Sequence, residues 1–308
     1  MRQRVVVAGL VVVLVAVLGL AFWLPGRGRP GLGGGAGGSV GIVAIEGVIS
    51  DGSSSGGLLG AVVGARTVVE QLRQAEEDGN VKAVVLRLNS PGGSAAASQE
   101  IARAVQRLRE AGKPVVASMG DTAASGAYWV ASAADKIVAD PATITGSIGV
   151  IIQVQNLQEL YDKLGIDSQV IKSGPHKDMG SGNRPLTSAE KDIFQGMVDD
   201  IYDQFVEAVA AGRGLSRQEV ARLADGRVYT GRQARQLGLV DTLGDYREAL
   251  SLAASLAGLP EPPAVKTFTR PSPWSFILSQ IQSAPYHLRL PAFQPDYWLL
   301  APAIEPAQ

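Results

Sequence analysis

The chain has 308 residues, with 28 Lys and Arg residues against 29 Asp and Glu residues, which leaves a formal net charge of −1. Nucleic-acid binders need a basic excess to neutralise phosphates, so this balance argues against a dedicated nucleic-acid-binding protein. The chain contains no cysteine and two histidines, which excludes disulfides, thiol catalysis, cysteine-ligated zinc and a three-histidine metal site within one chain. We therefore expect no metal or other cofactor, and any hydrolytic nucleophile must be something other than a thiol.

The first predicted element is a membrane anchor over residues 1–24. Arg2 and Arg4 precede an uncharged, apolar run from Val5 to Leu24. At about 1.5 Å per helical residue, such a run spans the hydrocarbon core of a bilayer, and Trp23 would sit at its interface. A cleaved signal peptide is the competing interpretation, but bulky residues stand at the end of the apolar run, where cleavage would be expected, and no small-residue cleavage site follows.

A flexible tether is predicted next, over residues 25–39, because this stretch is dominated by Gly and Pro. Arg27 and Arg29 follow the predicted anchor and nearly balance Arg2 and Arg4 before it. The distribution of positive charge therefore gives only a weak prediction of the anchor's orientation in the membrane. The very short N-terminal tail with its free amine favours a body on the extracytoplasmic side of the cell membrane.

The body alternates predicted strands and helices. Apolar, β-branched runs and segments with helical spacing follow one another along residues 40–49, 66–77, 81–88, 95–111, 114–119 and from 136. Capping boxes at residues 187–190 and 216–219 open two later helices, which we expect to serve core packing or oligomer contact. The repetition predicts an α/β fold in which helices cover a parallel sheet.

Three segments carry residues with catalytic potential, although each has a plain structural reading when taken alone. Gly92 and Gly93, which directly precede Ser94, allow backbone N–H groups to approach a ligand. Such a sequence is nevertheless usually only a turn. Ser125 lies among small residues at a strand-to-helix junction, where the N–H of Gly126 would face a developing oxyanion; tight packing explains the pattern as well. Lys177 follows a predicted strand, and surface lysines are common.

The three segments together, in this order on an α/β frame, resemble the short bacterial form of signal peptide peptidase A, a family within the Clp-protease/crotonase fold group. Ala127 and Trp129 replace the Gly and Tyr often found there. The resemblance covers about residues 40–256 and rests on the segments LNSPGGS at 88–94, MGDTAASGAYWVASAADKI at 119–137, TGSIGV at 145–150, KSGPHKD at 172–178 and GRVYTGRQARQLGLVD at 226–241.

The resemblance implies a serine–lysine dyad and repeated β-β-α units. Ser125 matches the nucleophile and Lys177 the general base, while Gly93 and Gly126 match the two oxyanion-hole donors. Ser147 matches a helper that hydrogen-bonds the lysine.

A lysine works as a base near neutral pH only when its ammonium form is disfavoured, and burial can supply that effect. We therefore expect Lys177 to be buried, without a carboxylate partner, and within hydrogen-bond reach of Ser125. Asp178 should point away from it, and His176 should be structural. The second histidine, His287, lies in a Pro-rich tail and is a poor candidate.

The implied function is that of a membrane-anchored serine endopeptidase, which cleaves remnant signal peptides and other hydrophobic segments at the membrane. The resemblance also implies a homo-oligomer, a ring or dome for which an octamer is one arrangement, with each site shared between neighbours. The peptidase domain is predicted over residues 40–258, followed by a Pro- and aromatic-rich extension over 259–308.

Three alternatives remain open at this stage. A Clp-type membrane protease acting on a particular membrane partner, such as a stomatin-like protein, differs only in its substrate. A crotonase-type acyl-CoA hydratase or isomerase shares the fold, but the anchor, Ser125 and Lys177 argue against it. A catalytically inactive membrane scaffold requires a dyad that does not assemble.

Overall fold

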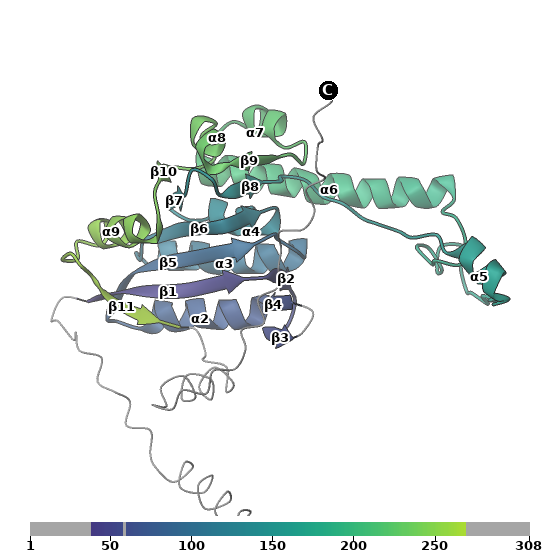
Figure 1. Cartoon of the computed structure of the whole chain (residues 1–308), viewed down its shortest axis with the longest axis horizontal. Coiled ribbons are helices and arrows are strands. Elements are labelled where there is room, and N and C mark those ends of the chain that lie inside the picture. The colour runs from purple at the N-terminus through teal and green to yellow at the C-terminus, as the bar shows by residue number, and fades with distance from the viewer. Residues whose placement is uncertain (1–37, 58–59, 269–308) are drawn as a thin grey trace, which may run out of the picture. The chain divides into compact units, whose positions relative to one another are not determined.

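The computed structural model describes residues 38–57 and 60–268, and Figure 1 shows their arrangement. The predicted anchor and all but the end of the tether, together with the chain after residue 268, lie outside the described residues. Within the described ranges, no helix is both long and apolar enough to cross a membrane.

The fold is built on an eight-stranded, mostly parallel sheet in the described part of the chain. Its order is β10-β7-β6-β5-β1-β11, and β8 joins β6 to β9. The strands are β1 (Ser39–Glu46), β5 (Val81–Ser90), β6 (Val115–Ala124), β7 (Lys136–Ala139), β8 (Ile144–Gly146), β9 (Val228–Thr230), β10 (Thr242–Leu243) and β11 (Ala264–Thr267). All these pairs are parallel except β8 with β9, so the predicted parallel sheet is confirmed as a mixed but mostly parallel one.

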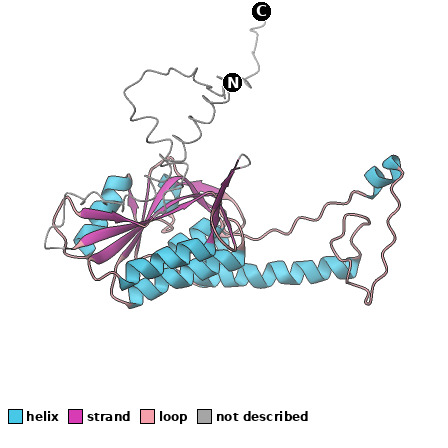
Figure 2. Cartoon of the chain, turned by 90° about the horizontal axis from the view of Figure 1, so that it is seen from below, coloured by secondary structure: helices cyan, strands magenta, loops and turns pink. Residues whose placement is uncertain are grey.

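The central strands are buried on both faces, as their continuous apolar runs predict. Along β5, Val84 and Leu86 pack into the larger core, whereas Ala83 and Val85 pack into a second core on the opposite face. Helices α2 (Ala65–Glu77), α3 (Ala95–Glu110) and α4 (Gly126–Ser132) cover the first face, and α9 (Tyr246–Leu256) covers the second. Figure 2 shows the strands above this layer of helices.

The implied β-β-α repeat is not visible as separate strands at the centre of the sheet. Strand β6 is continuous, but its Val116–Met119 half pairs with β7 and its Thr122–Ala124 half pairs with β8. One long strand thus serves two neighbours, and it ends beside Ser125.

A second, small sheet of β2 (Val48–Ser50), β4 (Gly60–Gly64) and β3 (Ser55–Gly57) lies next to the end of β5. Ile49 in β2 forms an isolated bridge with Gly93. The turn after β5 is therefore fixed by a neighbouring strand as well as by its own sequence.

The predicted C-terminal extension starts later than residue 259. Strand β11, Ala264–Thr267, pairs with β1 in parallel register and completes an edge of the sheet. The sequence does not predict this strand, because it follows a Pro-rich stretch. Its partner strand lies more than 200 residues earlier, so the strand is recognised only from the tertiary pairing.

The chain between β8 and α6 (Ser188–Arg213) forms an arm, by which we mean residues 151–187 and the N-terminal half of α6. It carries α5 (Gln158–Leu164), in which no residue is buried, and it extends from the sheet in Figures 1 and 2. Only the second half of α6 enters the core, through Phe205, Val206 and Val209. Helices α7 (Arg217–Leu223) and α8 (Gly231–Gln236) then lead the chain back to the sheet.

Candidate active site

Ser125 sits in a strained turn between β6 and α4. Its φ and ψ are 52° and −124°, a conformation that side-chain-bearing residues rarely adopt and that clusters at functional sites. The turn is fixed from both sides, because the N–H of Ser125 donates to Gly146 O at 2.8 Å and its carbonyl accepts from Trp129 N at 3.0 Å. Such a turn presents the hydroxyl to solvent while the backbone stays in the core.

The glycine turn after β5 packs directly against the Ser125 turn. A Cβ on Gly92, whose φ is +97°, would lie 2.6 Å from Gly126 N and 2.9 Å from Ser125 Cβ. A Cβ on Gly93, whose φ is +154°, would lie 2.0 Å from Ile49 O. Both positions therefore demand glycine, and the absence of side chains lets the two backbones meet.

This contact brings the backbone N–H of Gly93 close to Gly126. Gly93 N lies 3.3 Å from the point where a Cβ on Gly126 would stand. The N–H of Gly126, the first residue of α4, has no intrahelical acceptor, and no hydrogen bond from Gly93 N forms within the described residues. Two such donors next to a serine hydroxyl form the geometry of an oxyanion hole.

Four of the five predicted site residues share one cavity of about 730 Å³: Gly93, Ser125, Gly126 and Ser147. Ser147 has a φ of 49°, and its N–H donates to Arg227 O at 2.8 Å. It directly follows the residue whose carbonyl holds Ser125. The structure therefore brings to one place the residues that were predicted as the nucleophile, the two oxyanion donors and the helper.

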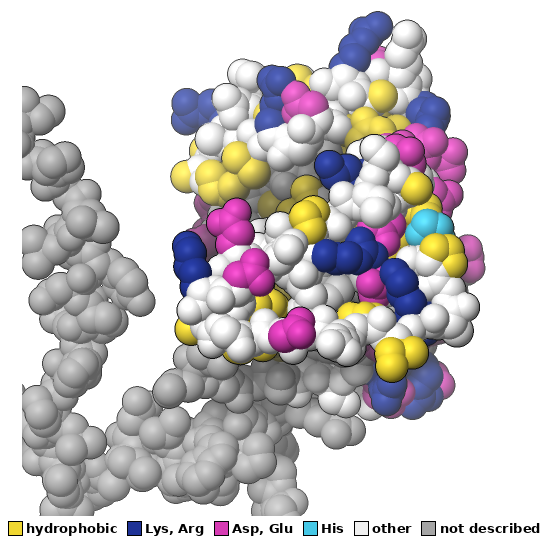
Figure 3. All heavy atoms as spheres, turned by 90° about the vertical axis from the view of Figure 1, so that its right-hand side faces the viewer, with side chains coloured by type: hydrophobic (Ala, Val, Ile, Leu, Met, Phe, Trp, Pro, Cys, Tyr) yellow, Lys and Arg dark blue, Asp and Glu magenta, His cyan; other side chains and the backbone are white. Residues whose placement is uncertain are grey.

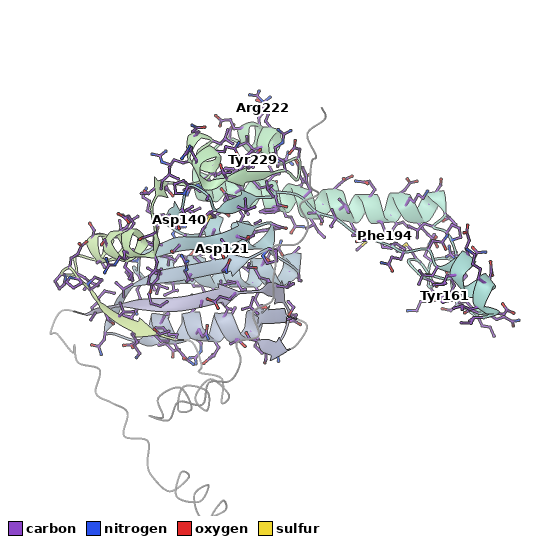
Figure 4. The ribbon with its side chains drawn as sticks, in the orientation of Figure 1. Asp121, Asp140, Tyr161, Phe194, Arg222 and Tyr229 are labelled. Atoms are coloured by element: carbon purple, nitrogen blue, oxygen red, sulfur yellow. The ribbon has the colours of Figure 1, made fainter. Side chains whose placement is uncertain are left out.

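Lys177, the fifth predicted residue, is not part of this cavity in the same chain. It is exposed and lies in a turn of the arm, where its N–H donates to Gly174 O at 3.3 Å. In the single chain Lys177 is neither buried nor part of the cavity that Ser125 lines, because the arm carries this turn away from the sheet. The dyad expected between neighbouring subunits stays a prediction. Tyr161 and Phe194 mark the arm in Figure 4, and Tyr229 marks the body that bears the cavity.

Two cations bind the carboxylate of Asp178, and within the described residues no ion pair forms between Asp178 and Lys177. Lys172 Nζ lies 2.7 Å from Asp178 Oδ1, and Arg184 donates to both oxygens at 2.8 and 3.0 Å. These hydrogen bonds, the Arg184 bond first, hold the pKa of Asp178 well below its usual range. His176 is exposed and lines no part of the cavity, so the described chain forms no Ser–His–Asp triad.

Arg184 also ties the turn to α6. It donates to both oxygens of Glu190 at 2.6 and 2.8 Å, while Thr187 and Glu190 close a capping box at the start of that helix. The side-chain bond from Arg184 and the backbone bond from Thr187 lower the pKa of Glu190 to about 2. Figure 3 shows basic and acidic side chains interspersed on the face that contains the end of the arm. The turn that bears Lys177 is thus held by a charged network.

Most of the remaining cavity lining is apolar, and these residues were missed as functional by sequence reasoning. Trp129 and Phe205 stack with ring centroids 4.5 Å apart and planes 9° apart. The remaining apolar lining includes Ile151, Ile152, Ile201, Tyr202 and Ala224. The available signal was the spacing of Trp129, one helical turn after Ser125 and so on the same side of α4.

Asp225 is the one ionisable side chain besides Tyr202 that lines the cavity in the described residues. Hydrogen bonds from the Arg227 side chain and backbone lower the pKa of Asp225, which keeps it ionised and paired. Across residues 38–57 and 60–268, no group of three His, Cys, Asp or Glu side chains lies together as a metal site. The cavity therefore combines a serine, backbone donors and an apolar wall, which suits acyl transfer from a hydrophobic peptide.

Comparison with known proteins agrees with this chemistry. Residues 107–260 match peptidase family S49, and residues 62–145 match the Clp protease family. The putative protease slr0021 from Synechocystis sp. is 45% identical over 211 residues, which cover 68% of this chain and 76% of that protein. The putative signal peptide peptidase SppA from Enterococcus faecium is 39% identical over 68% of this chain and 60% of its own length. Protease 4 from Haemophilus influenzae is 40% identical over 75% of this chain, which spans only 37% of that longer protein.

Proposed function

Because this chain belongs to peptidase family S49 and is a serine peptidase of the signal peptide peptidase type, we propose that it is a membrane-anchored endopeptidase with a shared Ser125–Lys177 dyad. Its substrates are remnant signal peptides and other hydrophobic peptide segments at the membrane. The observation that carries the proposal is the strained Ser125 turn packed against the glycine turn at the end of an apolar cavity.

The reaction begins with Ser125. Its Oγ attacks the peptide carbonyl carbon, and the carbonyl oxygen, now negative, accepts from the N–H groups of Gly93 and Gly126. Lys177 takes the hydroxyl proton and delivers it to the leaving nitrogen as the C–N bond breaks. Water then attacks the acyl ester through the same base, which releases the acid and restores the serine. Ser147 acts as a hydrogen-bonding partner of the lysine amine.

The placement of Lys177 supports a dyad formed between subunits. In its own chain the lysine is exposed on the arm, whereas Ser125 lines the cavity of the body. The arm also exposes apolar side chains, with Leu164 63% and Ile171 100% exposed. Burial of such residues against a second copy would cover apolar surface and desolvate the lysine at the same time. We propose that the assembly is a homo-oligomer in which each arm completes a neighbour's site. The family resemblance implies a ring or dome, such as an octamer.

The membrane association rests on the sequence of residues 1–24, which precedes the described body. Residues 25–39 then tether the peptidase domain close to the extracytoplasmic surface. The apolar cavity fits this location, because peptides that leave a bilayer are themselves apolar.

Labelling and subunit mixing test the proposal together. The full chain in detergent is treated with a fluorophosphonate probe beside Ser125→Ala, Lys177→Ala and Lys163→Ala, the last being a matched exposed lysine on α5. We expect labelling of the wild type and of the Lys163 variant only.

Co-assembly of Ser125→Ala chains with Lys177→Ala chains should then restore peptide hydrolysis that neither variant shows alone, because a shared site can combine one intact serine with one intact lysine. Full labelling of Lys177→Ala would refute the dyad. Failure of the mixed assembly, with both parents folded and oligomeric, would refute the sharing.

A further inference from the structure

Trp129 has a position that the catalytic chemistry does not use. It lies one turn after Ser125 in α4, and its backbone N–H donates to the Ser125 carbonyl at 3.0 Å. Residues four apart share one side of a helix, and both side chains line the 730 Å³ cavity. The Cα atom of Trp129 thus lies about 6 Å along the helix axis from that of Ser125, the rise of four helical residues.

The indole is fixed rather than free to swing. It stacks on Phe205 of α6, whose side chain is 1% exposed, with ring centroids 4.5 Å apart. The two helices meet closely behind the stack, since a Cβ on Gly212 would lie 1.9 Å from Ser132 O. The close contact between α4 and α6 and the stacking on Phe205 together restrict the orientation of the Trp129 ring.

A second cavity, of about 160 Å³ and open to solvent, also has Trp129 in its wall. Its lining comes from α3, from the end of α4 and from α6, and consists of Ala102, Gln106, Arg109, Trp129, Ser132, Ala133, Ala208, Ala211 and Gly212. Among the described residues, Trp129 alone lines both cavities. Trp129 therefore borders both the cavity that Ser125 lines and a second cavity that is open to solvent.

From this geometry we infer that Trp129 determines the size of the substrate side chain on the acyl side of the cleaved bond. The inference rests on the proposed function, since it concerns the substrate bound at Ser125. Side chains such as Ala, Val and Leu fill the apolar space in front of the indole. We expect a Trp side chain at this substrate position to press against the indole of Trp129, whose stack on Phe205 opposes movement of the ring.

Two peptide substrates that differ only in this residue, Leu or Trp, test the inference. The wild type should favour the Leu peptide, and Trp129→Ala should join the two cavities and favour the Trp peptide. We expect the ratio of kcat/KM for Trp over Leu to rise by about tenfold or more, within the range for steric discrimination in an apolar pocket. Should Trp129→Ala fail to fold, Trp129→Phe keeps the stack and should give a smaller rise in the same direction.

Two further variants separate pocket size from general loosening of the core. Val209→Ala removes buried volume from α6 at a residue that lines neither cavity, so the ratio should stay at the wild-type value. Ala208→Leu, added to Trp129→Ala, reduces the volume of the second cavity, which Ala208 lines. This double variant should again favour the Leu peptide.

An unchanged ratio in folded Trp129 variants, with Ser125→Ala inactive, would overturn this inference and leave the proposed function standing. Hydrolysis by Ser125→Ala itself would overturn the proposed function and this inference with it.

Discussion

The substitution Gly93→Ala tests the oxyanion hole most directly. The added methyl group would start 2.0 Å from Ile49 O and 2.8 Å from Ile49 N, where ordinary van der Waals contact needs at least 3.4 Å. Those neighbours are backbone atoms of β2, held by the hydrogen bond from Ser94 N to Ile49 O at 2.9 Å. The methyl group cannot be accommodated by a side-chain rotation, so the turn itself must retreat.

The size of the effect follows from the required movement. A retreat of about 1 Å removes the Gly93 N–H from the developing oxyanion, and misplacements of that size cost about 100-fold in rate. Loss of one oxyanion donor costs about 10²–10³ in kcat, or about 2.7–4 kcal/mol of transition-state stabilisation. The apolar wall around Trp129 is untouched, so KM should change much less than kcat.

Steady-state hydrolysis of a Leu-containing peptide by wild type and variant measures both constants, and urea denaturation establishes that the variant is folded. Gly79→Ala is the matched control, because a Cβ there meets nothing within 4 Å and its φ is not positive. A folded Gly93→Ala enzyme within about threefold of the wild-type kcat would refute the role of this N–H. A rise in KM alone would assign Gly93 to substrate binding instead.

Three further predictions concern stability. Tyr128→Phe should lower the free energy of unfolding in urea by about 1–3 kcal/mol, because the buried hydroxyl donates to Leu239 O at 2.8 Å and its loss leaves that carbonyl unpaired; an unchanged midpoint would contradict this. Glu190→Gln should lower the melting temperature at pH 7, and the difference from wild type should disappear as pH falls below the ordinary pKa of 4.5 toward the folded value of about 2, because the folded state favours the ionised carboxylate paired with Arg184. A difference that grew on acidification would reverse the assigned sign. Gly196 lies in α6, and a Cβ there would meet open space. Gly196→Ala should therefore raise the free energy of opening of that helix, measured by hydrogen exchange, by about 0.5–1 kcal/mol. Faster exchange would refute this.

Much of the fold was predictable because it depends on local patterns. The apolar runs of β1, β5 and β6 and the helical spacing of α3 predict strands and helices in the observed order. Strand β11 was not predictable, because its four residues lack a distinctive pattern and are ordered by pairing with β1. Continuous strand β6, shared between two neighbours, likewise depends on how the sheet bends rather than on composition.

The candidate site divides in the same way. Gly93, Ser125 and Gly126 stand in short turns whose sequences restrict the backbone, so their local geometry could be inferred before any fold was known. The arm that bears Lys177 contains little buried surface, and nothing in its local sequence determines the direction in which it leaves the sheet. The arm itself therefore gives no physical basis for predicting which serine the lysine meets.

The sequence by itself determined the available chemistry: no thiol, scarce imidazole, a serine in a small-residue turn and a lysine in a charged one. Tertiary structure alone decided which of these groups meet. It joined the glycine turn to the Ser125 turn, stacked Trp129 on Phe205 in the wall of the cavity, and left Lys177 exposed on the arm. The reason is that turn conformation depends on a few adjacent residues, whereas proximity between distant segments depends on the packing of the whole sheet and its helices.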